Sequence, residues 1–490
     1  MRKIRFDFNN MFGFSVGSTH GVADADIRSL KNGIARAHSH LRRVLAGKTN
    51  RVNLGLEWAM LPYQDPRTIQ AIQRLGNEIA AKFDNVISLG IGGSYLGLKA
   101  AQDALAPAYY NEFPSGRKGR PRIYFEGNNL DPETLSVLLK NLDPKKTFVV
   151  VISKSGETTE TKAAFLLVQR WLKRRVGARY GRQVVAVTDP SSGTLRSIVK
   201  AESAADPKSF RSLPLLKGVG GRYSEFNMGL LHLAVIGIDI NEVLAGARSM
   251  ARRCSSPGLF KNPAYLYAAL AVIQYRRKRK PITILMPFSE GLKSTADWYC
   301  QLLAESTGKK FARKVVIKPS GLEQWVPDKS SVKNVGRTPI ATRGTNDLHS
   351  VQQNNIEGEN DKVVTFIRVE KFSHDLRIPR NAGFLSGKYY GRLLSLAQEA
   401  TEWALVREKR PNCAIIMPEV SAFHWGELIY FFEMATACEG ELLGINAFDQ
   451  PGVEGYKNYM YYKLRKPGLP PDVAALIRQH PLRKKPSLVI

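Results

Sequence analysis

Residues 147–162 read TFVVVISKSGETTETK, and the order of residue types in this stretch indicates the fold class. Residues 149–152 form an uninterrupted β-branched run, which is typical of a parallel strand buried on both faces. A hydroxyl-rich turn follows, and apolar residues then recur at helical spacing. Such a turn places hydroxyls and free backbone N–H groups at a helix N-terminus, which suits a phosphate group. The alternative is an ordinary helix cap, in which the same hydroxyls satisfy the first backbone amides.

Short apolar strands alternate with helical patterns on both sides of this unit. In the first half, the patterns predict helices at 24–45 and 66–83 and strands at 86–89, 123–125, 147–152 and 184–188. In the second half, they predict a helix at 228–243 and strands at 282–286, 315–317, 363–369, 414–417 and 442–444. This alternation predicts an α/β fold, with parallel sheets and helices on both faces. The 490 residues are too many for one simple core, so at least two domains are expected.

The charge balance is unusual, because 72 Lys and Arg residues stand against 43 Asp and Glu residues, a net charge of +29. A basic surface attracts anions and binds nucleic acid without specificity. The basic runs, however, fall at the ends of predicted helices and in the C-terminal tail, and they lack interleaved aromatic residues that would stack on bases. We therefore expect solvated basic faces and no specific nucleic-acid partner.

The apolar segments and the cysteine spacing indicate the cellular compartment. No apolar run has the length of a membrane span, and the start MRKIRFDFNN lacks the apolar core of a secretory signal. The cysteines at 254, 300, 413 and 438 are far apart and form neither a disulfide framework nor a zinc pattern. We expect a cytoplasmic protein with no membrane partner and no metal site.

A glycine turn, GIGGS at residues 90–94, follows the first predicted strand. It is superficially like the dinucleotide fingerprint GxGxxG, but Tyr95 stands where the third glycine is required. Gly93 and Ser94 can instead bring backbone N–H groups close to a sugar or phosphate. In a doubly wound sheet, this turn and the turn at Ser153 would lie at the carboxyl ends of adjacent strands, where ligands bind.

Six motifs stand in a fixed order along the chain. They are GIGGSYLG at 90–97, SKSGETTET at 153–161, GVGGRYS at 218–224, AESTGK at 304–309, GTNDLHSVQ at 344–352 and FDQPGVEGYK at 448–457. Together they resemble the motifs of the glucose-6-phosphate isomerase (phosphoglucose isomerase) family. Their residues are similar to those of the shorter bacterial branch of that family. The resemblance implies two sugar-isomerase (SIS) type domains, each a mainly parallel sheet flanked by helices in three αβα layers.

The resemblance also implies the division of the chain. We expect an N-terminal helical segment at 1–69 that packs on the larger domain, a smaller SIS domain at 70–230, a larger one at 231–465 and a basic tail at 466–490. The tail matches no motif of the family, and its prolines delay a helix to residues 472–479.

Four residues match the catalytic groups of the family. Glu305 matches the base that moves a proton between neighbouring carbons, and Gln301 lies four residues earlier, on the same helical face. Arg222, after two glycines, matches the cation that stabilises an enediolate. His349 and Lys457 match the residues that open the sugar ring. Outside the motifs, each of the four would more often be an ordinary surface, turn or structural residue.

The remaining matches concern substrate binding. By resemblance, Ser153, Ser155 and Thr158 hold the phosphate, and Gly93 and Ser94 hold the sugar. Gln450 binds a hydroxyl or a phosphate oxygen, and Gln301 is a further substrate-binding residue. Lys154 either adds charge beside the phosphate or points to solvent. No metal ligand set and no cofactor is implied.

These matches imply a reversible isomerisation of glucose 6-phosphate and fructose 6-phosphate through a cis-enediolate, as in glycolysis and gluconeogenesis. They also imply a homodimer, in which His349 reaches the active site of the neighbouring subunit. Two alternatives stay open on the sequence: an isomerase that also accepts mannose 6-phosphate, and a non-catalytic sugar-phosphate-binding SIS protein. The presence of all four catalytic matches argues against the second.

Overall fold

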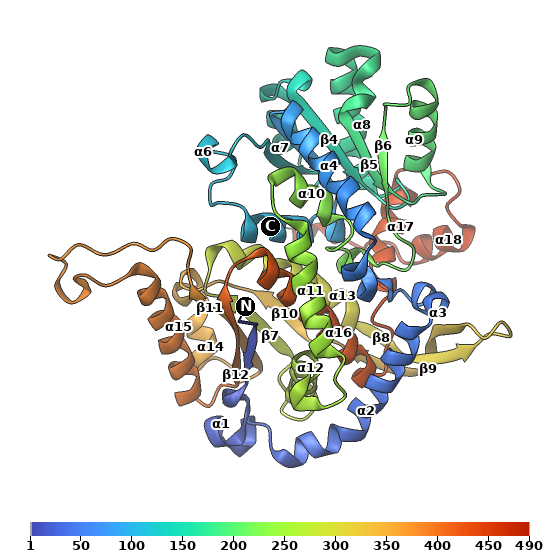
Figure 1. Cartoon of the computed structure of the whole chain (residues 1–490). Coiled ribbons are helices and arrows are strands. Elements are labelled where there is room, and N and C mark those ends of the chain that lie inside the picture. Colours follow the sequence, from blue (N-terminus) through green and yellow to red (C-terminus); the bar gives the residue numbers. More distant parts are fainter. Residues whose placement is uncertain (1, 490) are drawn as a thin grey trace. The chain divides into compact units, whose positions relative to one another are not determined.

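The computed structural model describes residues 2–489, which contain two five-stranded sheets and a two-stranded hairpin (Figure 1). The chain forms two compact units, Met1–Ala447 and Phe448–Ile490, and both five-stranded sheets belong to the first. The prediction of an α/β fold with mainly parallel sheets is confirmed. The predicted domain boundaries at 69, 230 and 465 stay predictions.

The first sheet has the strand order β3-β2-β4-β5-β6, and all its pairs are parallel. Its strands are β2 (Asn85–Leu89), β3 (Arg122–Glu126), β4 (Thr147–Ile152), β5 (Val184–Thr188) and β6 (Arg211–Pro214). The strand predicted from the opening stretch, β4, is central and buried at every residue, as its β-branched run requires. Leu89 lies opposite Val151, so the turns that follow β2 and β4 are neighbours at the same sheet edge.

Helices cover both faces of the first sheet. They are α4 (Pro66–Lys82), α5 (Leu96–Leu105), α7 (Pro132–Asn141), α8 (Thr159–Val176), α9 (Thr194–Ala205) and α10 (Gly229–Ile236), with the short α6 (Pro114–Arg117) at the edge. On one face, α7, α8 and α9 pack on alternate strand residues such as Ile87 and Val149. On the other face, Phe83 after α4 contacts Phe148 of β4, and His232 of α10 contacts Phe125 of β3.

The second sheet has the order β1-β12-β11-β7-β10, and only β1 runs antiparallel to its neighbour. Its strands are β1 (Arg5–Asp7), β7 (Ile282–Pro287), β10 (Thr338–Ala341), β11 (Lys362–Lys371) and β12 (Asn412–Glu419). The helices of this half are α1 (Gly13–His20), α2 (Asp24–Ala46), α3 (Lys48–Asn53), α11 (Ile240–Cys254), α12 (Pro263–Arg276), α13 (Lys293–Thr307), α14 (Gln352–Glu357), α15 (Tyr390–Arg407) and α16 (Ala422–Leu443). Figure 1 shows α14 and α15 on one side of this sheet and α11, α12 and α16 on the other.

Residues 315–317 are in a strand as predicted, but this strand, β8 (Lys309–Ile317), pairs antiparallel with β9 (Glu323–Val335) in a separate hairpin rather than in the sheet. Two other predictions in the second half are wrong. Residues 442–444 are the end of α16, which stops at Gly444 in the left-handed region. The pattern at 228–243 forms two helices instead of one, because the chain turns at Gly237, at φ 83°, and Asp239 caps α11.

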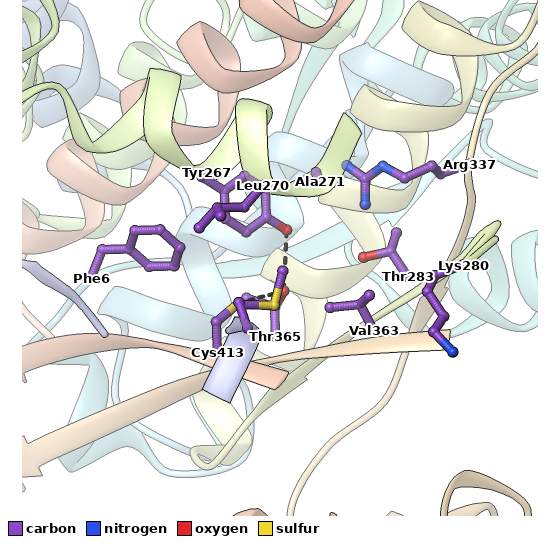
Figure 2. A pocket seen from close by; sticks show the side chains of 11 residues that line it. Phe6, Tyr267, Leu270, Ala271, Lys280, Thr283, Arg337, Val363, Thr365 and Cys413 are labelled. Atoms are coloured by element: carbon purple, nitrogen blue, oxygen red, sulfur yellow. Dashed lines mark hydrogen bonds between the residues drawn. The ribbon is translucent and has the colours of Figure 1, made fainter. Parts of the chain in front are cut away.

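A cavity of about 10 Å³ lies between α12 and the second sheet, large enough for about one water molecule (Figure 2). The hydroxyl of Tyr267 lies 3.2 Å from the Thr365 hydroxyl, which in turn lies 3.5 Å from the Cys413 sulfur (Figure 2). This polar chain is internal to the core, and none of the predicted site residues lines the cavity.

The second unit contains α17 (Glu454–Lys463) and α18 (Pro471–Gln479). The helix predicted at 472–479 after the prolines is therefore confirmed. Across residues 2–489, none of the helices combines the length and the apolar character needed to cross a membrane.

Candidate functional site

Two glycine turns meet in the first unit. One is the turn after β2, at Gly92–Ser94, and the other is the turn at Gly221–Tyr223. A Cβ atom on Gly93 would lie 2.1 Å from the Gly221 carbonyl carbon, so the two backbones are in direct contact. Gly92 has φ 58°, and its own Cβ would lie 2.9 Å from the Gln301 amide nitrogen of α13. Only glycines permit this approach, which brings the β2 turn, the Arg222 turn and α13 together.

Arg222 is fully buried in this contact, with 1% of its surface exposed. Its guanidinium donates to the Ser306 hydroxyl at 2.8 Å, the Glu305 carboxylate at 3.1 Å and the Ala447 carbonyl oxygen at 2.7 Å. Tyr223 also reaches Ser306, at 3.1 Å between the hydroxyl oxygens. A buried guanidinium held by several acceptors is a rigid cation, fixed in position before any ligand binds.

Glu305 lies in the last turn of α13, and both its carboxylate oxygens have partners. One accepts from Arg222, and the other accepts from the Gln301 amide at 3.0 Å, so the prediction that Gln301 and Glu305 share a helical face is confirmed. The Lys309 ammonium donates to the backbone carbonyl of Glu305. About a quarter of the Glu305 side chain stays exposed, which lets a ligand reach the carboxylate. A fixed carboxylate beside a buried guanidinium can move a proton and hold the negative charge that results.

The hydroxyl-rich turn predicted from the opening stretch lies between β4 and α8. The Ser153 hydroxyl accepts from the Gly156 N–H and the Ser155 hydroxyl from the Glu157 N–H, both at 3.1 Å. A hydroxyl that accepts one hydrogen bond keeps its proton for another acceptor. Thr158 stands at the N-cap of α8 without a capping bond from its side chain. This turn can therefore offer several donors to an anion at the start of an 18-residue helix.

Two other predicted binding residues differ in their surroundings. The Lys154 side chain is exposed. The backbone carbonyl of Lys154 holds the turn in place, because it accepts hydrogen bonds from the Thr188 hydroxyl and the Asp189 N–H, both at 3.2 Å. Ser94 is half-buried, and its hydroxyl donates to the Met228 sulfur at 3.6 Å.

His349 is not brought to Glu305 within the chain. It ends a short 3₁₀ turn after β10 and is exposed, and its imidazole makes no hydrogen bond with the rest of residues 2–489. In the same loop, Arg343 forms an ion pair with Glu290, just before the start of α13. Glu305 lies twelve residues into that helix from Lys293, about 18 Å along its axis. The loop of His349 and the carboxylate of Glu305 are therefore at opposite ends of α13.

Gln450 and Lys457 belong to the second unit. Gln450 precedes the 3₁₀ turn Pro451–Val453, and Lys457 lies on α17 with its ammonium 2.9 Å from the Glu454 carboxylate. Partial burial lowers the pKa of Lys457, but the hydrogen bond and charge of Glu454 outweigh it, so the pKa is raised.

Two contacts of this site were not predicted from the sequence. Ser306 and Tyr223, which hold Arg222 and each other, stand directly beside Glu305 and Arg222 in their motifs. Their place in the motifs is the signal that could have identified them. Nowhere in residues 2–489 do three or more His, Cys, Asp or Glu side chains gather closely enough to hold a metal ion.

The chain is an α/β protein with two mainly parallel sheets, and a glycine turn and a hydroxyl turn lie at adjacent strand ends of the first sheet. The profile described as phosphoglucose isomerase matches residues 68–326 and 396–465. A protein of Carboxydothermus hydrogenoformans named glucose-6-phosphate isomerase is 38% identical over 494 residues, which cover 99% of both chains. One of Symbiobacterium thermophilum with the same name is 37% identical over 419 residues, 84% of this chain and 87% of the relative.

Solved structures agree with these relatives. A hypothetical protein of Thermus thermophilus is 31% identical and has a TM-score of 0.77, covering 94% of this chain and 99% of its own. A glucose-6-phosphate isomerase of Chlamydia trachomatis, at 23% identity and a TM-score of 0.75, covers 94% of this chain and 90% of its own and shares the fold. The chain belongs to the phosphoglucose isomerase family, and the resemblance read from its motifs is confirmed.

Proposed function

We propose that the chain interconverts glucose 6-phosphate and fructose 6-phosphate, a step of glycolysis and gluconeogenesis. Membership of its family makes it an aldose–ketose isomerase. The observation that carries the assignment of residues is the Arg222–Glu305 pair, joined at 3.1 Å beside the facing glycine turns.

Glu305 and Arg222 divide the central step between them. Glu305 takes the proton from C2 of the open-chain aldose, and the electron pair of that C–H bond forms the C1=C2 double bond while O1 becomes negative. Arg222 stabilises this cis-enediolate through its buried guanidinium. Glu305 then returns the proton to C1, and the carbonyl forms again at C2 as one hydroxyl proton passes from O2 to O1. Gln301 keeps the carboxylate oriented through its 3.0 Å hydrogen bond.

The phosphate of the substrate binds at the turn after β4. Ser153, Ser155 and Thr158 supply hydroxyl donors, and the N-terminus of α8 adds its partial positive charge. Lys154, whose side chain is exposed, adds charge beside them. The sugar lies along the adjacent turn, where the approach of Gly93 and Ser94 to the Arg222 turn sets its position.

Ring opening needs a further acid and base, and we assign these to His349 and Lys457, with Gln450 on a sugar hydroxyl or phosphate oxygen. His349 acts in the neighbouring subunit of a homodimer. In support, its loop lies at the start of α13 and Glu305 near the end, so His349 of the same chain is badly placed for the Glu305 site. Its exposed imidazole, with no hydrogen bond to residues 2–489, is open to a partner.

The buried Arg222 network also bears on the alternative of a non-catalytic binding protein. Such a protein needs the phosphate turn but gains nothing from a buried guanidinium beside a partly exposed carboxylate. The four cysteines are all free thiols, which suits our proposal of a cytoplasmic enzyme.

The test of the activity is a coupled assay of the purified protein with fructose 6-phosphate, with and without a chelator, together with Glu305→Gln. This variant keeps the shape of the side chain but removes the base, so kcat should fall about 10²- to 10⁴-fold while the fold is retained. Glu357→Gln is the matched control, because Glu357 also accepts from a glutamine four residues earlier, at 2.7 Å, but is exposed on α14. Near-normal turnover of Glu305→Gln would contradict the assignment of the base.

The test of the dimer is complementation. His349→Ala and Glu305→Gln are mixed, partially unfolded and allowed to re-pair, which gives mixed dimers in about half the population. If His349 serves the neighbouring site, each mixed dimer has one site with both defects and one with neither, and activity returns to about a quarter of the wild-type level. If mass spectrometry demonstrates subunit exchange and no activity returns, both residues serve the same chain's site.

A further inference from the structure

Glu225 lies two residues beyond the end of the Arg222 turn and is buried, with 2% of its surface exposed. One carboxyl oxygen accepts from the Trp298 indole N–H at 2.7 Å, and Trp298 lies on α13, two helical turns before Glu305. A Cβ on Gly97 of α5 would lie 2.4 Å from the same oxygen, so the glutamate fills a space that only a glycine leaves open. The carboxyl group is therefore wedged between α5 and α13.

Glu433 of α16 is fully buried, and its carboxyl group is a close neighbour of that of Glu225. The second oxygen of Glu225 and both oxygens of Glu433 are buried, and no N–H or O–H elsewhere in residues 2–489 donates to them. Two ionised carboxylates that are close neighbours repel each other, and each would leave its oxygens without hydrogen-bond donors in the core. One proton between the two groups removes both penalties.

We propose that Glu225 and Glu433 share one proton and act as a positioning pair, which ties the Arg222 turn to α13 and α16. This proposal rests on the catalytic role proposed above for Arg222. Neither carboxyl group of the pair forms a hydrogen bond with Glu305, whose carboxylate partners are Arg222 and Gln301. The pair therefore acts from outside the reacting groups. It acts through Arg222, three residues away along the chain, and through Trp298 on the helix that carries the base.

The charged and titratable groups around the pair are few. Tyr223 faces both carboxyl groups from the Arg222 turn and lies beside Arg222 itself, and Tyr430 faces Glu433 from α16. Trp58 stacks on Tyr223, at 5.1 Å between ring centres, and closes that side with an apolar surface. Burial therefore dominates, and it raises the pKa of both carboxyl groups.

The stability of the folded protein should depend on pH through the shared proton. Above about pH 4.3, an unfolded glutamate has lost its proton, but the folded protein still holds it. Stability from this proton is complete below that value and is lost as the pH rises through the raised pKa at which the folded pair gives up the proton. In Glu225→Gln, the amide donates a hydrogen to Glu433 at every pH and the neighbouring negative charge is gone, so this loss is smaller.

The experiment compares Glu225→Ala, Glu225→Gln and Glu433→Gln with the wild type in steady-state kinetics and thermal melting. Glu225→Ala should lose about 100-fold in kcat with little change in KM, because displacement of a catalytic group by about 1 Å costs that much. Glu225→Gln should recover most of that loss. Between pH 5.5 and 8, the melting temperature of the wild type should fall further than that of either Gln variant.

Glu427→Ala is the matched control. Glu427 is equally buried on α16, but its partners are the Ile4 N–H at 3.0 Å and the Ser249 hydroxyl at 2.8 Å, outside the site. It should lower stability and leave kcat unchanged. The proposal is overturned if Glu225→Ala keeps its kcat, or if the Gln variants melt with the pH dependence of the wild type. Melting needs no activity, so it decides on the shared proton even if the isomerase assay fails or Glu225→Ala does not fold.

Discussion

Gly93→Ala is the smallest change that should disable the site without removing a functional group. The added Cβ would lie 2.1 Å from the carbonyl carbon and from the carbonyl oxygen of Gly221, and 2.7 Å from the backbone nitrogen of Arg222. All three are backbone atoms, so no side-chain rotation can relieve the contact. Either the β2 turn or the Arg222 turn must move.

The size of the movement follows from these distances. Non-bonded carbons attract best at about 3.5 Å, so the backbones must separate by about 1.4 Å. Overpacking of this kind costs about 1–3 kcal/mol, while the change from glycine to alanine returns about 0.4–1 kcal/mol through the unfolded chain. The chain should therefore stay folded and lose only modest stability. A shift of about 1 Å in Arg222, however, should lower kcat about 100-fold.

Gly221→Ala provides the control within the same contact. Its Cβ would lie 3.8 Å from the Cα of Gly93, an ordinary van der Waals distance. Both variants are measured in the coupled isomerase assay and by thermal melting. We expect Gly221→Ala to stay near wild type in both. If Gly93→Ala retains wild-type kcat, the contact between the turns does not position Arg222, and the reasoning fails.

Two further predictions concern the phosphate turn and the β8–β9 hairpin. Ser153→Ala combined with Thr158→Ala should raise KM for fructose 6-phosphate more than it lowers kcat, because contacts remote from the reacting carbons supply uniform binding; unchanged substrate affinity in the double variant would contradict this. His40 lies 2.8 Å from Glu441 and 2.8 Å from Glu323 of β9, and the hydrogen bond to Glu441 chiefly raises its pKa. Its stabilising contribution is therefore complete below about pH 6.5 and lost as the pH rises through the raised value, so the melting temperature of the wild type should fall more between about pH 6 and pH 9 than that of His40→Gln.

The strands that the sequence predicted correctly are those whose burial leaves a continuous apolar run. β4 and β5 are buried at every residue, and their bounds follow the run closely. β6 and β10 were not predicted, because both are four-residue edge strands that contain a proline, and an edge strand has no need of a fully apolar sequence. The sequence pattern at residues 442–444 wrongly predicts a strand because a helix buried all round, such as α16, has no polar face to show its period.

Some contacts of the site follow from the local sequence, and others depend on tertiary packing. Gln301 and Glu305 are four residues apart on one helix, so their contact follows from helical geometry alone. The contact of Gly93 with Gly221 and the pair of Glu225 with Glu433 depend on how two sheets and three helices pack, and no local pattern contains that information. The motifs assign residues to the site by resemblance, while the physical reason for the glycines is the contact between the two turns.

These contacts explain why a site with so few reacting groups needs so much supporting structure. A cation that stabilises an enediolate is effective only if it is already in place, because reorientation in the transition state would consume the gain. Arg222 stands on a turn, and a turn is normally mobile. Here the turn is fixed from two directions, by the backbone of Gly93 on one side and by the buried carboxyl pair at Glu225 on the other. Loosening either support should therefore lower turnover more than substrate affinity, although neither support touches the substrate.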